Sequence, residues 1–82
     1  MTKKFIKPES PLIGADGNIF NLIAIASRSL KENNYSEEAE EMTKRVMQSS
    51  SYEEALGIIN EYVEPVNVYE HEISQRDYID YE

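Results

Sequence analysis

The chain has 82 residues, 40% of them hydrophobic, and a formal net charge of −8 from 8 basic and 16 acidic side chains. This length allows one domain with a modest core, and the lack of cysteine excludes a disulfide framework and a thiolate nucleophile. The acidic balance argues against direct binding to nucleic acid or to an anionic membrane, and favours a basic protein partner.

Residues 1–15 hold two prolines and no sustained periodicity, which predicts an extended N-terminal arm. The basic start runs into Pro8 and Pro11 rather than into an apolar stretch, so we expect no signal peptide and a cytoplasmic protein. Two interpretations of the "FI" pair at residues 5–6 stay open: it packs on the body of the domain, or it pairs as a short strand with "VNV" at residues 66–68.

A first helix is expected near residues 17–33, after an Asp-Gly-Asn turn in which Asp16 or Asn18 is the N-cap. The turn lacks the glycine spacing and the lysine of a phosphate-binding loop, and Asp16 has no second acid nearby for calcium. One face of the helix is apolar, at Ile19, Leu22, Ile23, Ala26 and Leu30. Phe20, Ala24 and Ile25 are apolar as well, so we expect a central helix with little exposed surface before Arg28.

A second helix is expected near residues 36–49, with Ser36 as its N-cap and acids in its first turn. A narrow apolar stripe forms its buried side, at Ala39, Met42 and Val46. Its outer face carries Glu37, Glu40, Glu41 and Lys44. A charge run of this kind is typical of a solvated helix face, and no Glu-x-x-His pair is present that a di-iron site requires.

A third helix is expected near residues 52–64, because Ser51 and Glu54 have the spacing of a capping box and Pro65 ends the pattern. Gly57 costs helix stability, and we hypothesise that it allows a close approach between helices. The predicted apolar face consists of Tyr52, Ala55, Leu56, Ile59 and Val63, with Tyr62 beside it.

Residues 66–82 are expected to form an acidic, tyrosine-rich tail without a periodic apolar face. The only histidine, His71, lies in this tail, where a preorganised site is hard to build. We therefore expect no catalytic residue, no metal site and no cofactor, and the protein is not expected to be an enzyme.

Acidic and tyrosine side chains together offer charge and rigid aromatic contact area to a basic groove. This composition is the one expected of a nucleic-acid mimic. The candidate partner-binding residues are Glu40, Glu41, Glu53, Glu61, Tyr69, Glu70, Glu72, Asp77, Tyr78, Asp80 and Tyr81.

The stretch "LIGADGNIFNLIAIASRSLKENN" and the later "SYEEALGIINEYV" resemble a group of short proteins of unknown function from phages and integrative elements of Gram-positive bacteria. The similarity covers residues 12–63, and the Asp-Gly-Asn turn followed by Phe20 is its most specific part. The resemblance implies an origin in a mobile element. It implies no activity and no site residues.

These patterns predict an all-α fold, a small three-helix domain at residues 16–65 between the N-terminal arm and the acidic C-terminal tail, with minor β pairing left open. The predicted function is a small, acidic, non-enzymatic interaction module of a phage or mobile element that binds a basic protein. One form of it is an inhibitor that occupies a nucleic-acid-binding surface, as anti-CRISPR proteins do. The alternative is a structural or accessory homodimer, paired through apolar residues left on the first and third helices.

Overall fold

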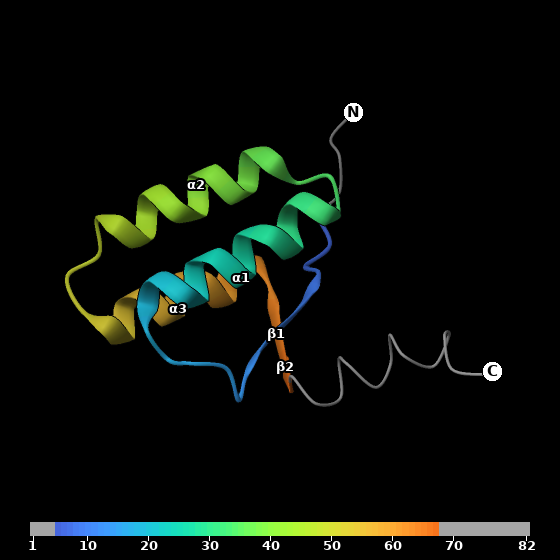
Figure 1. Cartoon of the computed structure of the whole chain (residues 1–82). Coiled ribbons are helices and arrows are strands. Elements are labelled where there is room, and N and C mark those ends of the chain that lie inside the picture. The colour runs from blue at the N-terminus through green and yellow to red at the C-terminus, as the bar shows by residue number, and fades with distance from the viewer. Residues whose placement is uncertain (1–4, 68–82) are drawn as a thin grey trace.

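The computed structural model describes residues 5–67. The elements follow the chain in the order β1 (Glu9–Ile13), α1 (Ile19–Glu32), α2 (Ser36–Met47), α3 (Tyr52–Tyr62) and β2 (Glu64–Asn67). The prediction of a small, mostly helical domain with three helices is confirmed. Its all-α class is corrected, because β1 and β2 form a two-stranded parallel sheet (Figure 1). β1 lies within the segment expected as an arm, and β2 crosses the expected boundary between residues 65 and 66.

The elements are arranged in three layers (Figure 1). α1 and α3 form the middle layer, since both contact α2 and each also contacts one strand, β1 or β2. Within the described part of the chain, α2 contacts neither strand. Parallel strands require a long crossover connection, and here the three helices together provide it. α1 thus lies in the middle layer, which it shares with α3.

The helix ends are fixed by side-chain and backbone caps. Of the two candidate N-caps of α1, Asn18 is the one used, and its Oδ1 accepts the Phe20 N–H at 2.9 Å. Beyond the other end of α1, Asn34 adopts a left-handed backbone conformation with φ 70°, which asparagine tolerates well. Ser36 is the first residue of α2 and not its N-cap; Tyr35 holds that position without a side-chain cap.

The capping box at the start of α3 is confirmed with one change of partner. The Ser51 Oγ accepts the Glu54 N–H at 3.1 Å, as predicted. The Glu54 carboxylate reaches back to the N–H of Ser50 at 3.0 Å rather than to that of Ser51. Both bonds satisfy amides that would otherwise have no partner at the helix end.

The core lies between the three helices and consists of apolar side chains with at most 8% of their surface exposed. It confirms the predicted stripe of α2 and most of the predicted face of α1. Its members are Leu22, Ile23, Ala26, Leu30, Ala39, Met42, Val46, Ala55, Ile58, Ile59, Tyr62 and Val63.

Two details of the predicted faces are wrong. α3 buries Ile58 and exposes Tyr52, so its inner face is rotated relative to the prediction. α1 exposes Phe20 and Ala24, so it is not covered all round before Arg28. Gly57 is exposed, and apart from its chain neighbours and the backbone of its own helix no atom of the described chain lies within 4 Å of where a Cβ would stand. The hypothesis that Gly57 allows a close approach between the helices of residues 5–67 is therefore wrong.

The sheet pairs Glu9 with Glu64 and Ser10 with Pro65. The Glu64 N–H donates to the Pro8 carbonyl at 2.9 Å. Because successive residues of a strand point their amides to opposite edges, the nitrogen of Pro65 faces away from β1. Its missing N–H therefore costs no bond between the strands, and proline at an outer edge discourages the addition of another strand.

The "FI" pair is not part of either strand. The Phe5 ring instead lies edge-on against Tyr35, with ring centroids 4.7 Å apart, and against Tyr62 at 6.4 Å. The Tyr35 hydroxyl also accepts the Ile6 N–H at 3.2 Å. Of the two open interpretations, packing on the body is confirmed for Phe5, whereas Ile6 is 64% exposed. The strand pairing of this pair is wrong.

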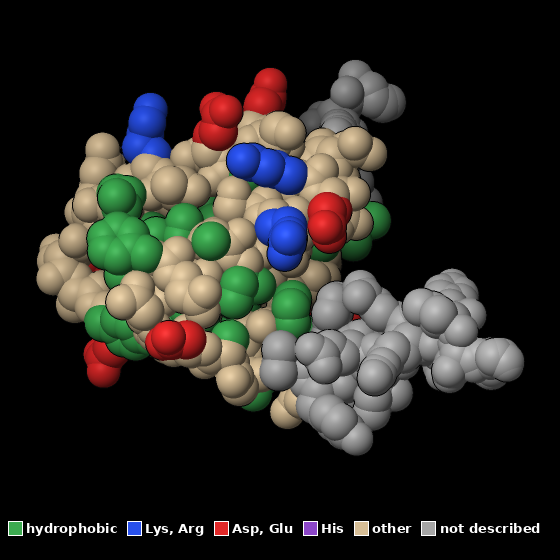
Figure 2. Space-filling model, viewed as in Figure 1, with side chains coloured by type: hydrophobic (Ala, Val, Ile, Leu, Met, Phe, Trp, Pro, Cys, Tyr) green, Lys and Arg blue, Asp and Glu red, His purple; other side chains and the backbone are tan. Residues whose placement is uncertain are grey.

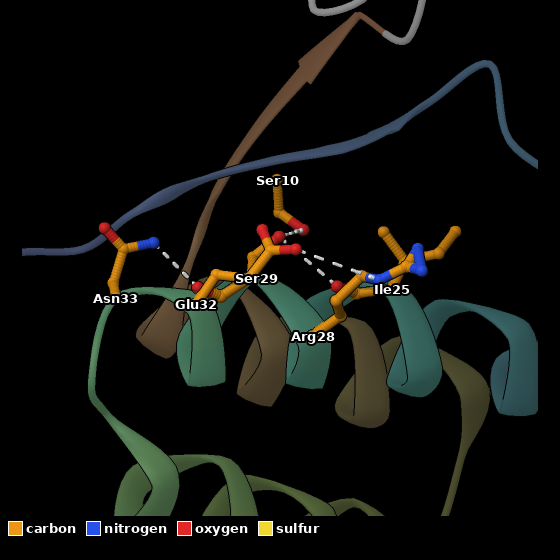
Figure 3. Close-up of polar contacts among 6 residues, drawn as sticks. All are labelled: Ser10, Ile25, Arg28, Ser29, Glu32 and Asn33. Atoms are coloured by element: carbon orange, nitrogen blue, oxygen red, sulfur yellow. Dashed lines mark hydrogen bonds and ion pairs between the residues drawn. The ribbon is translucent and has the colours of Figure 1, made fainter.

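A buried serine pair joins β1 to α1 (Figure 3). The hydroxyl oxygens of Ser10 and Ser29 lie 2.8 Å apart, and the two residues are 0% and 7% exposed. The Ser29 hydroxyl also donates to the Ile25 carbonyl at 3.3 Å, so it accepts its second bond from Ser10. The Asn33 side-chain amide donates to the Ser29 carbonyl at 2.7 Å and ties the end of α1 to the same place.

Candidate interaction surfaces

The outer face of α2 carries an acidic row formed by Glu37, Glu40 and Glu41, all exposed. These positions fall at i, i+3 and i+4, so they are neighbours on one side of the helix. Acidic side chains project from the edge of the molecule that α2 forms (Figure 2). The ion pairs found between residues 5 and 67 include none of the three. The row is therefore available to a cation outside the described chain.

Glu53 is also exposed but belongs to a different place. It lies in the first turn of α3, beyond the C-terminal end of α2, whereas Glu40 and Glu41 lie near the middle of α2. Acids in a first turn interact favourably with the helix dipole. The structure therefore does not bring Glu53 into the acidic row.

Glu61 is held in an ion pair between α3 and α2. Nη1 and Nη2 of Arg45 lie 2.6 and 3.4 Å from its two carboxylate oxygens, and Nη1 also donates to the Tyr62 hydroxyl at 3.1 Å. The hydrogen bond from Arg45 lowers the pKa of Glu61, and the charge of Lys7 acts in the same direction. The bonds to Glu61 and Tyr62 raise the pKa of Arg45 further. The Glu61 carboxylate thus already has a cationic partner within the chain.

The remaining candidates lie outside the described residues. They are Tyr69, Glu70, Glu72, Asp77, Tyr78, Asp80 and Tyr81, and the same holds for His71.

The turn before α1 has its polar groups engaged within the chain. The Asp16 carboxylate accepts the Asn18 N–H at 3.1 Å, and the Asp16 carbonyl accepts the side-chain amide of Asn21 at 2.9 Å. The Tyr52 hydroxyl donates to the Gly17 carbonyl and joins the turn to α3. A phosphate at this turn would need free backbone amides, but the Phe20 N–H already donates to the Asn18 side chain. The turn is organised as a helix cap.

An exposed apolar surface surrounds the start of α1; apolar residues left over on the first and third helices were expected from the sequence, but without their positions. Phe20, Met47 and Tyr52 are 63%, 60% and 48% exposed, and they line an open hollow of about 350 Å³ between the ends of the three helices. Figure 2 shows hydrophobic side chains gathered over this part of the molecule. The available signal was that the first helix holds more apolar residues than one core face can use.

Within residues 5–67, no group of three or more His, Asp or Glu side chains is placed to hold a metal ion. No helix in that part of the chain is long and apolar enough to cross a membrane. Comparison with family models, with curated proteins and with solved structures gave no match.

Proposed function

We propose that this protein is an acidic, non-enzymatic binding module of a phage or other mobile element, and that its partner is a basic protein. The observation that carries the proposal is the acidic row of α2, whose carboxylates are exposed and take no part in the ion pairs of the described chain. The described residues hold eleven acidic and five basic side chains. Two of the five, Arg28 and Arg45, are already paired with acids, so the field around the molecule is negative.

Such a field steers a basic partner to the surface and raises the association rate. Each exposed ion pair contributes little by itself and is screened by salt. Aromatic side chains anchor complexes of this kind, and the tail tyrosines are the anchors that the sequence offers. A basic nucleic-acid-binding surface is the form of partner that suits this chemistry, which would make the protein an inhibitor of that surface.

The test compares the full chain with two charge-reversed variants as immobilised baits. Glu40→Lys/Glu41→Lys reverses the acidic row, and Glu9→Lys/Glu64→Lys makes the same change of net charge at two exposed, paired positions of the sheet. We expect a basic protein from bacterial lysate to bind the unaltered chain and the sheet variant, but not the row variant. Equal capture by all three baits would show that the row is not the binding surface.

A second candidate function, a structural or accessory homodimer, is favoured by a different observation, the exposed apolar surface around Phe20 and Met47. A chain of this size gains stability from pairing with a second copy, because its own core is small.

A further inference from the structure

The outer side of α1 differs in charge from the rest of the surface. A stripe of five residues at helical spacing runs along it without an acid: Phe20, Ala24, Ser27, Arg28 and Lys31. An open groove of about 670 Å³ lies along this stripe, with Thr43 of α2 at its opposite wall. Phe20 and Ile23 line both this groove and the apolar hollow beside it, so the two are continuous.

Two copies of an acidic chain repel each other over most of their surfaces. Along the α1 stripe this repulsion is smallest, because Glu32 is the one acid of the described chain that lines its groove. Figure 2 shows basic side chains and a hydrophobic cluster on this one face of the molecule. The nearest acid, Glu32, lies 3.9 Å from Arg28 in an exposed pair.

The stripe also has a direction. Its N-terminal half is apolar, at Phe20 and Ala24, and its C-terminal half is basic, at Arg28 and Lys31. We propose that a second copy of the chain packs against this stripe, with the two α1 helices antiparallel and the two-fold axis passing between Ala24 and Ser27. The inference rests on the second candidate function, the homodimer, whose pairing it specifies, and it is separate from the acidic row and its basic partner.

Antiparallel pairing makes the stripe complementary to itself, as a two-fold interface requires. Counted from this axis, Phe20 of one copy faces Lys31 of the other. Aliphatic stems of lysine and arginine cover apolar surface, and their charges are attracted to an aromatic face. A parallel arrangement would instead place Lys31 against Lys31. The small side chains of Ala24 and Ser27 at the centre let the two helices approach closely.

The helix ends add a second match. The first turn of α1 contains no acid, although an anion is favoured at a helix N-terminus. In the antiparallel pair, Glu32 of one copy lies opposite Ile19, the first residue of the other α1. The exposed Phe20 ring and the basic half of the stripe are thus both matched by one arrangement, and Glu32 lies near a helix N-terminus that Asn18 caps.

The test uses single-cysteine variants of the full chain, since the natural sequence has no cysteine. Disulfides form only where the two Cα atoms lie within about 7 Å of each other. In a two-fold dimer, only a residue beside the axis lies that close to the same residue of the second copy. Lys31 lies 5.5 residues from the axis, so two Lys31 residues would be about 16 Å apart at a rise of 1.5 Å per residue. Ala24→Cys and Ser27→Cys are the reporters, with Lys31→Cys as control on the same stripe and Glu41→Cys on α2.

Under mild oxidation we expect Ala24→Cys and Ser27→Cys to form linked dimers about tenfold faster than both controls, because pairing raises the effective thiol concentration. We expect light scattering to give a dimer mass for the unaltered chain. Phe20→Ser should shift it towards monomer with an unchanged helical spectrum, since the ring is 63% exposed within one chain. Equal linking rates for all four variants, fast linking of Lys31→Cys, or a monomer mass up to about 1 mM would overturn the proposal.

Discussion

Removing the buried serine pair tests how β1 is held against α1. The Ser10 hydroxyl is fully buried and its bond is to Ser29, whereas Ser29 also donates to the Ile25 carbonyl. Ser29→Ala therefore leaves a buried hydroxyl without its partner, which costs about 1–3 kcal/mol of unfolding free energy. Ser10→Ala leaves Ser29 with one bond, so its cost is closer to about 1 kcal/mol.

The double variant separates this bond from general loss of packing. With both hydroxyls removed, no buried donor or acceptor is stranded, so the double change should cost less than the sum of the single changes. We expect a coupling of about 1 kcal/mol, and the loss of each kcal/mol should lower the melting temperature by about 4–8 °C in a domain of this size.

The assay is urea unfolding followed by far-ultraviolet circular dichroism. Ser27→Ala is the matched control, because Ser27 lies on the outer stripe of the same helix. We expect its stability to be unchanged or slightly higher, since alanine is the better helix former. Costs of the two single changes that add within about 0.3 kcal/mol would refute a shared, buried hydrogen bond.

Three further outcomes are expected from thermal melts. Ser51→Ala should cost about 1 kcal/mol through loss of the α3 cap, and an unchanged melt would mean that this cap does not stabilise the helix. Gly57→Ala should stabilise by about 0.5–1 kcal/mol, because the site is helical and open; a loss of stability would reveal a contact there. For the ion pair, the pKa of Glu61 in the folded chain lies below its ordinary value of 4.5, so the folded chain binds fewer protons than the unfolded chain. The stability that the ion pair contributes is therefore present above pH 4.5 and is lost as the pH falls through the pKa of the folded state. The difference between the unaltered chain and Glu61→Gln should therefore shrink from about pH 7 to about pH 3, and a difference independent of pH would contradict this origin.

The helices could be predicted because their signals are local. The capping box at Ser51 and Glu54 and the stripe of α2 depend on residues within a few positions of one another. Most of the predicted face of α3 is buried as expected, at Ala55, Ile59 and Val63. Tyr52 was included and Ile58 missed because both are apolar, and periodicity alone does not decide between two overlapping faces.

The sheet could not be predicted in the same way, since its two strands are 50 residues apart and each contains a proline. β1 has no alternating pattern, and its most buried residue is Ser10. That burial depends on a partner, Ser29, on another element. The α2 acids were found from the sequence, because a charged helix face has a period; the pairing of Glu61 with Arg45 was not, because it depends on how two helices pack.

Binding through the acidic row is tested most sharply by the association rate of the full chain with the captured basic protein, measured by surface plasmon resonance at about 0.05 M and about 0.5 M salt. We expect the association rate of the unaltered chain to fall steeply as the salt concentration rises, and that of the Glu9→Lys/Glu64→Lys variant to fall in the same way. The Glu40→Lys/Glu41→Lys variant should associate slowly at both salt concentrations. An association rate that is independent of salt, or equal for the two variants, would contradict the proposed role of the row.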